Sequence, residues 1–320
     1  MRNIFSLVSK VALSVAIAVV LSATAFSQAS LRKALDFNGD GKTDFSVFRP
    51  ENNSWYILRS DGTTQFQTFG SANDDYMAPG DFDGDGKADV SVWRDTTGVW
   101  YRLNSSTNTF VAIQFGTTGD EPVQRDYDGD GKTDVAVVRR SNGTMTWYVL
   151  RSSDGALSAG NFGLATDYTA PGDFDGDGKF DWGVQRPGAT PTSSATFYAI
   201  KSSDGSLYAV TWGLSNDLFV PGDYDGDGKT DLAVVREGPT NLSWYVLNSS
   251  DSSFTAYGFG LSATDLIAQG DYDGDGKTDP GVWRDSNGTF YVLKSGAGYN
   301  LLAQQWGNSN DSPVASYDTH

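Results

Sequence analysis

Residues 81–89 read Asp-Phe-Asp-Gly-Asp-Gly-Lys-Ala-Asp, and this segment decides how the rest of the chain is interpreted. Copies of the pattern D-x-[DN]-G-D-G-K-x-D, which we call the acidic loops, recur at intervals of 45 to 50 residues. They begin at Asp36, Asp81, Asp126, Asp173, Asp223 and Asp271. A period of this length indicates a repeat architecture in which each copy forms one small structural unit.

More than the acidic loop recurs in each unit. Directly after it comes a β-rich run that ends in arginine, such as residues 90–94. An aromatic pair such as Trp100-Tyr101 and an aromatic–glycine pair such as Phe115-Gly116 follow, and turn dipeptides such as Asn142-Gly143 separate the runs. We therefore expect four short strands in each unit, because nothing after residue 29 shows a sustained helical period.

The predicted fold is all-β, a β-propeller whose blades are four-stranded antiparallel sheets with the acidic loops in their hairpins. Six units are complete. Residues 31–35 and 312–317 both match the short segment that precedes each loop. Either the ring has six blades and one end strand is redundant, or an incomplete seventh position closes it. We favour six.

The acidic loop has the donor set of a calcium site. Asp81, Asp83, Asp85 and Asp89 place carboxylates at loop positions 1, 3, 5 and 9, and Lys87 at position 7 can offer its backbone carbonyl. Calcium accepts about six to eight oxygen ligands in flexible geometry, whereas magnesium retains water and zinc prefers nitrogen or sulfur. The alternative is that Asp and Gly only make good turns, which would not require acids at the same positions in every copy.

Up to six Ca²⁺ ions are expected, because acids crowded into one loop repel each other unless a cation is bound. Asn38 replaces an acid in the first loop, which should make that site the weakest. The predicted ligands are Asp36, Asn38, Asp40, Lys42, Asp44; Asp81, Asp83, Asp85, Lys87, Asp89; Asp126, Asp128, Asp130, Lys132, Asp134; Asp173, Asp175, Asp177, Lys179, Asp181; Asp223, Asp225, Asp227, Lys229, Asp231; and Asp271, Asp273, Asp275, Lys277, Asp279.

The loop matches the first half of an EF-hand, but position 12 holds valine where an EF-hand needs a bidentate glutamate. We expect the loop to join two strands, with these valines in the second strand facing a core between blades. They are Val47, Val92, Val137, Val184, Val234 and Val282.

The remaining composition excludes several kinds of site. The 320 residues include 40 acids and 23 bases, for a net charge of -17, with no cysteine and one histidine, His320. Thiol chemistry, disulfides and multi-histidine metal centres are therefore excluded. The negative charge argues against a nucleic-acid partner, because phosphate would be repelled.

The N-terminus has the features of a secretory signal peptide. Arg2 and Lys10 flank the start, an apolar run of about 15 residues follows, and small residues surround Gln28. A membrane span needs roughly 20 residues. We expect residues 1–29 to be removed, leaving a single propeller domain, 30–320, that is secreted or periplasmic and has no membrane span. An uncleaved N-terminal anchor is the alternative.

These motifs resemble the FG-GAP / VCBS repeat family, the calcium-bearing propeller units also found in the integrin α-chain head and some fungal lectins. The resemblance rests on the acidic loops, on pairs such as Phe69-Gly70 and on the Ala-Pro-Gly segments 78–80 and 170–172, and it covers residues 31–317. It implies an integrin-α-like propeller with Ca²⁺ in hairpin loops on one face. It implies little about function, since members serve adhesion, sugar binding and scaffolding. Segments 122–125 and 268–270 depart from the Ala-Pro-Gly pattern.

Other recurring residues have structural interpretations first. The aromatic pairs are expected to pack between blades, with stacking on sugars as the alternative. The arginine of each unit is expected to bond to a carboxylate or carbonyl of its own blade, with a ligand-binding ring as the alternative. Trp93 and Trp283 vary between units, which favours a surface role. Acids that follow the aromatic–glycine pairs are expected to cap turns, namely Asp74, Asp120, Asp167, Asp217 and Asp311.

The preferred function is a non-enzymatic, calcium-dependent binding or adhesion module whose partner is a glycan or an extracellular protein. The alternative is an exported carbohydrate-active enzyme, a hydrolase or lyase, on the same scaffold. An acidic cleft confined to one unit would favour the enzyme, and a repeated shallow aromatic pocket would favour the binding module. A third interpretation is a stable spacer.

Overall fold

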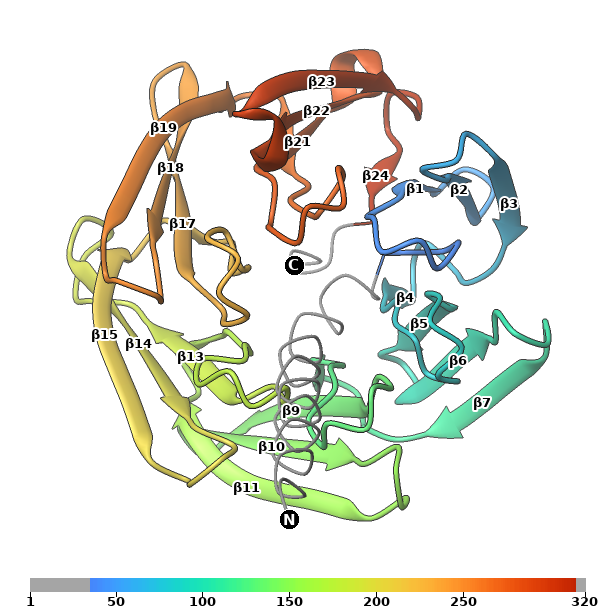
Figure 1. The fold of residues 1–320 in the computed structure, drawn as a ribbon. Coiled ribbons are helices and arrows are strands. Elements are labelled where there is room, and N and C mark those ends of the chain that lie inside the picture. Colours follow the sequence, from blue (N-terminus) through green and yellow to red (C-terminus); the bar gives the residue numbers. More distant parts are fainter. Residues whose placement is uncertain (1–34, 315–320) are drawn as a thin grey trace, which may run out of the picture.

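A computed structural model describes residues 35–314, which form a ring of six four-stranded antiparallel sheets around a central axis (Figure 1). The predicted signal peptide, residues 1–29, lies outside the described residues. Within the described part, helical structure is limited to two 3-10 turns, η1 (Asp285–Asn287) and η2 (Ser295–Ala297). No helix between residues 35 and 314 is long and apolar enough to cross a membrane. The predicted all-β propeller is confirmed.

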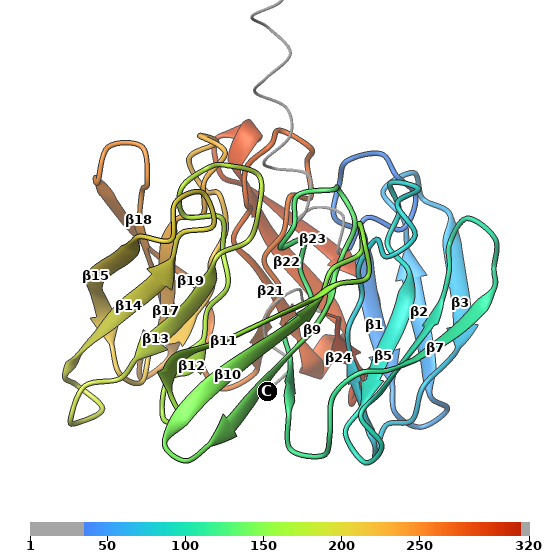
Figure 2. The same ribbon diagram turned by 90° about the horizontal axis from the view of Figure 1, so that it is seen from below.

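Each sheet is one blade, with its first strand nearest the axis and its fourth at the rim (Figures 1 and 2). From the inner to the outer strand, blade 1 is β24 (Ser312–Pro313), β1 (Phe45–Arg49), β2 (Ser54–Leu58) and β3 (Thr64–Thr68); blade 2 is β4 (Asp75–Met77), β5 (Val90–Arg94), β6 (Val99–Leu103) and β7 (Phe110–Gln114); blade 3 is β8 (Glu121–Pro122), β9 (Val135–Ser141), β10 (Thr144–Leu150) and β11 (Leu157–Leu164); blade 4 is β12 (Tyr168–Thr169), β13 (Trp182–Arg186), β14 (Ser194–Ile200) and β15 (Leu207–Leu214); blade 5 is β16 (Leu218–Phe219), β17 (Leu232–Glu237), β18 (Asn241–Leu247) and β19 (Phe254–Leu261); blade 6 is β20 (Asp265–Ile267), β21 (Gly281–Arg284), β22 (Thr289–Lys294) and β23 (Asn300–Gln305).

The C-terminal strand closes the ring. In blade 1, Val47 pairs with Pro313 and Phe48 with Ser312, so β24 provides the inner strand of a blade whose other strands come from the start of the chain. The ring therefore has six blades, as favoured. The C-terminal segment is not redundant, because it completes blade 1.

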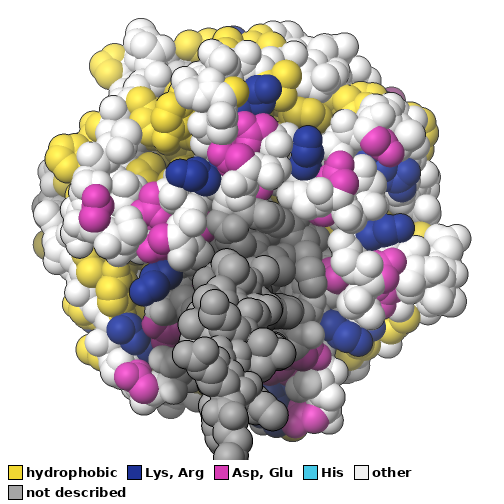
Figure 3. Space-filling view, in the orientation of Figure 1, with side chains coloured by type: hydrophobic (Ala, Val, Ile, Leu, Met, Phe, Trp, Pro, Cys, Tyr) yellow, Lys and Arg dark blue, Asp and Glu magenta, His cyan; other side chains and the backbone are white. Residues whose placement is uncertain are grey.

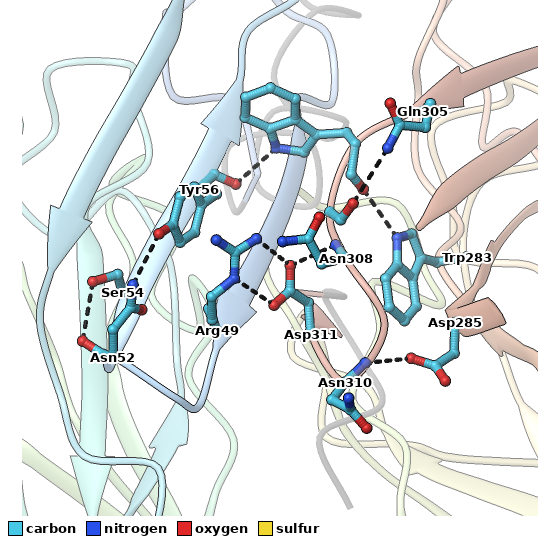
Figure 4. A network of polar contacts seen from close by, with 12 residues as sticks. Arg49, Asn52, Ser54, Tyr56, Trp283, Asp285, Gln305, Asn308, Asn310 and Asp311 are labelled. Carbon is cyan, nitrogen blue, oxygen red and sulfur yellow. Dashed lines mark hydrogen bonds and ion pairs between the residues drawn. The ribbon is translucent and has the colours of Figure 1, made fainter. Parts of the chain in front are cut away.

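Side chains reinforce this closure (Figure 4). Arg49 donates two hydrogen bonds of 2.8 Å to Asp311, which directly precedes β24. The indole N–H of Trp306 donates to the backbone carbonyl of Tyr56 at 3.0 Å, and the Asn310 amide donates to Asp285 at 2.7 Å. Contacts between distant parts of the sequence thus join blade 6 to blade 1.

The hydrophobic core lies between neighbouring blades. The valines at loop position 12 are at most 1 % exposed, as predicted for an interblade core. Each packs on the glycine of the preceding blade's aromatic–glycine pair. Gly163 has a φ of 97°, and a Cβ atom there would lie 2.9 Å from Val184 Cγ1. Glycine is therefore required both by its backbone conformation and by the approach of the next blade.

The aromatic pairs pack between blades, as predicted, and Trp147 shares a core cluster with Val184 of the next blade. The first member is buried, and where it is tryptophan it also bonds the backbone: Trp147 Nε1 donates to the Phe162 carbonyl at 2.9 Å. The second member is a tyrosine beneath the recurring arginine, with the Arg139 guanidinium 4.9 Å from the Tyr148 ring centroid. Both members of each pair therefore make contacts that stabilise the fold.

The recurring arginines each form a two-point ion pair with a buried aspartate of their own blade, as expected. That aspartate also accepts a turn amide: Asp120 binds Arg139 and the Thr117 N–H. In blade 2 the partner is Asp75, and the neighbouring Asp74, which was expected to cap the turn, is exposed. The pairs are Arg49–Asp311, Arg94–Asp75, Arg139–Asp120, Arg186–Asp167, Arg236–Asp217 and Arg284–Asp265. These arginines are committed to the scaffold.

The predicted surface role of Trp93 and Trp283 is wrong, because both side chains are 0 % exposed. In blade 6, where the aromatic pair begins with Phe290, the Trp283 indole donates to the Trp306 carbonyl at 3.1 Å. Trp147 makes the equivalent bond in blade 3 from the neighbouring strand. In blade 2 both Trp93 and Trp100 donate to the Phe115 carbonyl, so the position varies although it is buried.

Candidate metal centres

The second to sixth acidic loops connect the first and second strands of their blades near the axis, and the first loop leads into β1, since β24 supplies the inner strand of blade 1. The ends of the loop are held by a bridge between the strands, as between Gly80 and Asp89 in blade 2. Figure 3 shows acidic and basic side chains interspersed around the middle of the face on which Figure 1 places these loops. The six loops therefore gather on one face of the ring.

The first and last aspartates organise the loop from inside. Asp81 accepts the amides of Gly84 and Gly86, at 2.7 and 3.0 Å. Asp89 accepts the amides of Phe82 and, across the blade, of Ser105. The same pattern recurs in the other acidic loops, so positions 1 and 9 are buried while positions 3 and 5 lie nearer to solvent.

In five loops, three carboxylates come close enough to hold one metal ion. Their ligand atoms lie within 4.8 Å of one another, and the groups are Asp81, Asp83, Asp85; Asp126, Asp128, Asp134; Asp173, Asp175, Asp181; Asp223, Asp225, Asp231; and Asp271, Asp273, Asp279. The first loop has only Asp36, Asp40 and Asp44 as acids, and they form no such group, consistent with the substitution at Asn38.

The structure brings the predicted ligands together unequally. The compact groups contain positions 1, 3 and 5 in the second loop but positions 1, 3 and 9 in the later four. The position 7 amide donates to the position 5 carboxylate, as from Lys87 to Asp85 at 2.9 Å. The lysine side chain extends to the neighbouring loop, where Lys87 Cγ would lie 3.2 Å from a Cβ atom at Gly39.

Serines that the sequence analysis did not single out orient the exposed carboxylates. Ser105 Oγ donates to Asp85 at 2.9 Å, and Ser106 Oγ donates to Asp83 at 2.6 Å. The only sequence signal is a Ser-Ser pair after the third strand in four units, at residues 105–106, 152–153, 202–203 and 249–250. The number of residues between this Ser-Ser pair and the acidic loop differs from unit to unit, so the sequence alone does not indicate that the serines contact the loop.

Burial makes the loop carboxylates costly to ionise. It raises the pKa of Asp134 and Asp173 to about 7 and that of Asp181 to about 6, against an ordinary value of 3.8. Hydrogen bonds from backbone amides lower these pKa values, whereas the other carboxylates of the same loop raise them further. A bound cation would remove both the repulsion and the loss of hydration. The donor set and its electrostatics therefore fit a hard, oxygen-liganded metal ion.

The loops are also bonded to one another in a closed ring. The amide of position 8 in each loop donates to the carbonyl of position 1 in the preceding loop. These bonds, of 2.6 to 2.8 Å, run from Ala88 to Asp36, Thr133 to Asp81, Phe180 to Asp126, Thr230 to Asp173, Thr278 to Asp223 and Thr43 to Asp271. We call this arrangement the loop ring. Its carbonyls belong to residues whose carboxylates are predicted metal ligands.

Side chains at the loop ring are matched between neighbours. Where the residue before a loop is glycine, position 8 of the next loop is threonine, as for Gly270 and Thr43. The Thr43 hydroxyl accepts the Asp271 amide at 2.9 Å. Where that residue is larger, the neighbour differs: Leu35 packs in the same cluster as Ala88. At the third loop two large residues meet instead, with the Arg125 guanidinium 5.8 Å from the Phe180 ring centroid.

Gly270→Ala should lower the free energy of unfolding by about 1–3 kcal/mol, because its Cβ atom would lie 2.6 Å from Thr43 Oγ1. Thr43→Ala alone should also destabilise the protein, through loss of the bond to Asp271. In the double variant the clash is absent, so the combined cost should be smaller than the sum of the two single costs. Urea unfolding of all four proteins measures this coupling, and strict additivity would refute the contact.

The pH dependence of stability should reverse sign when metal is removed. Metal-free folded protein keeps protons on carboxyls such as Asp134, with a pKa of about 7, that the unfolded chain releases near 3.8. Its stability should therefore be greatest below about pH 4 and fall as pH rises to 7. With metal bound, protons compete with the cation, so stability should rise over the same range. Melting temperatures at several pH values, with and without metal, would show parallel trends if the loops held no ion.

The comparisons with known proteins agree with this architecture. The model of the FG-GAP-like repeat matches residues 36–92, 126–184 and 223–280, and each match begins at the first aspartate of an acidic loop. No curated protein matches the chain closely enough to be counted as a relative.

Two solved structures are similar to this chain at low identity. An oligogalacturonate lyase in complex with manganese is 13% identical, with a TM-score of 0.51 over 88% of this chain and 79% of that chain. A catalytically inactive virginiamycin B lyase from Staphylococcus aureus is 10% identical, with a TM-score of 0.47 over 84% and 86%. Such identities concern the fold alone. Because the repeat model covers more than half of the residues, this chain belongs to the FG-GAP-like repeat family.

Proposed function

We propose that the chain is an exported calcium-binding β-propeller that acts as a binding or adhesion module for a glycan or a surface protein, and is not an enzyme. The observation that carries the metal assignment is the set of five three-carboxylate groups, repeated at the same place in successive blades. Their ligands are all oxygen atoms in a loop with two glycines, which suits the large, flexible coordination shell of calcium.

The side chains of positions 1, 3, 5 and 9 would hold the ion, together with the position 7 carbonyl. When bound, calcium would supply the positive charge that the buried carboxylates lack. In the first loop, Asn38 offers a neutral oxygen, and its amide group already bonds Ser60. That loop is expected to be the weakest site.

The binding role is supported by how the repeated residues are used. The recurring arginines are paired with aspartates, and the first members of the aromatic pairs are buried. Because these residues serve the scaffold, a ligand would be recognised by side chains that differ between blades. This is the usual division of roles in repeat proteins, where a common framework carries variable surfaces.

One cavity favours the second candidate, a carbohydrate-active hydrolase or lyase. A cavity of about 480 Å³ at blades 1, 2 and 6 is lined by Asp74, Asp75, Asp95, Tyr76 and Leu266, among others. Asp75 is ion-paired with Arg94. Asp74 and Asp95 are therefore the two carboxylates of this cavity that could act on a substrate. A glycosidase needs two carboxyl groups about 5–10 Å apart.

Metal-stripped protein should take up to six Ca²⁺ ions in calorimetric titration, and excess Ca²⁺ should raise the melting temperature by mass action. Asp85→Asn should weaken one site, because Asp85 belongs to a three-carboxylate group. Asp74→Asn is the matched control, since Asp74 is exposed and outside the loops. Equal uptake by both variants, or a melting temperature indifferent to Ca²⁺, would contradict the assignment.

A glycan array probed with and without Ca²⁺ tests the binding role. We expect glycans to be retained in Ca²⁺, released by chelation and recovered chemically unchanged. Analysis of the retained glycans for new reducing or unsaturated ends decides between the two candidates. If such products form with the unmodified protein but not with Asp74→Asn or Asp95→Asn, the chain is an enzyme and the binding-module proposal is wrong.

A further inference from the structure

A second cavity, of about 300 Å³, lies between blades 3 and 4 beside the fourth acidic loop. Its walls include Tyr127, Arg151 and Ser158 from blade 3, and Trp182 and Lys201 from blade 4. Its polar lining combines two cationic side chains with hydroxyl groups. We call it the blade 3–4 cleft.

Trp182 distinguishes this cleft from the other blade interfaces. The residue directly after the acidic loop is Phe45, Val90, Val135, Leu232 or Pro280 in the other units. The half-buried Trp182 ring lies parallel to Trp147, at 6.0 Å between centroids and 9° between planes. On β11, Gly160 makes room for it, because a Cβ atom there would lie 2.8 Å from Trp182 Cζ3. A flat aromatic surface is thus held rigidly in the cleft wall.

Each wall also contributes one cation from the same position of the repeat, directly after the third strand. Arg151 pairs with the exposed Asp154 of its own turn. Lys201 forms no ion pair with any residue between 35 and 314, although its charge helps to lower the pKa of the exposed Asp204 in its own turn, and its Nζ lies 6.0 Å from the Tyr208 ring centroid. In a chain of net charge -17, an unpaired lysine in a cavity is available for an anion.

The acid in the cleft does not cancel this charge. Asp181 lines the cavity but is only 1 % exposed, and its two oxygens accept the amides of Ser202 and Phe174, at 2.6 and 2.9 Å. It is also a predicted metal ligand of the fourth loop. On the opposite wall, the Ser158 hydroxyl makes no bond to another described residue, so it can donate to or accept from a ligand.

We propose that the blade 3–4 cleft binds an acidic saccharide, with the ring of a hexuronic acid against Trp182 and its carboxylate at Lys201 and Arg151. The inference rests on the proposed binding function and adds the ligand class and its place. An aromatic face suits the apolar face of a sugar ring, and the two cations select for charge. Polar groups placed on a largely apolar lining are typical of small-ligand sites.

The test is calorimetric titration of the full chain in Ca²⁺ with trigalacturonate and with its methyl ester, which has the same rings without the charge. We expect the ester to bind at least tenfold more weakly. Lys201→Asn and Trp182→Val should each weaken trigalacturonate binding about tenfold. Asparagine and valine occupy the equivalent positions at Asn104 and Val90, so both variants should fold, and their melting temperatures confirm it.

Lys294→Asn is the matched control, because Lys294 holds the position of Lys201 in blade 6, and it should bind trigalacturonate like the unmodified protein. Equal binding of acid and ester, equal losses in the two lysine variants, or preference for an acidic peptide would overturn the proposal. Neutral glycans retained on the array without any effect of Lys201→Asn would overturn it while leaving the binding module intact. Absence of any glycan or protein ligand would instead remove the binding function itself.

Discussion

The hydrogen bond from loop position 8 to the position 1 carbonyl of the preceding loop is the contact that joins each blade to the next near the axis. It occurs at every blade boundary, and the bond from Thr43 to Asp271 closes the circle. A propeller has no single core, so neighbouring blades must be fixed individually. The loop ring does this with backbone atoms, which explains why position 8 itself varies among Thr, Ala and Phe.

The same loops carry the main electrostatic cost of the fold. Position 1 contributes its carbonyl to the loop ring and its carboxylate to the metal group, so both functions meet in one residue. Burial raises the pKa of several of these carboxyls well above the ordinary value, which means that the metal-free ring resists ionisation. A cation would stabilise the individual loop and, through the loop ring, the contact between blades.

Repetition and variation divide the molecule into framework and candidate surface. Glycine, valine, arginine and tyrosine recur because every blade boundary poses the same packing problem, as at Gly163 and Val184. The cavity linings, by contrast, include residues found in one unit only, such as Asp74 and Trp182. Binding chemistry is therefore expected where the repeat is broken.

The amino-acid sequence by itself determined the period, the all-β class, the loop positions and the fact that the recurring arginines bond within their own blades. These follow from local patterns, in which turn residues and alternating burial specify short strands, and six copies reinforce each other. It misjudged Trp93 and Trp283, because variation at one position was taken for exposure, whereas the structure buries both rings. It also selected Asp74 over Asp75, because one extra residue in the turn after Gly70 shifts the buried acid by one place.

Only the tertiary structure decided how the ring closes, which serines support the carboxylates and where the two cavities lie. Each depends on contacts between residues far apart in the chain, such as Val47 with Pro313 or Ser106 with Asp83. A repeat pattern describes the neighbours of a residue along the chain. Which side chain of the next blade faces that residue depends on how the blades pack in three dimensions, and no local motif predicts it.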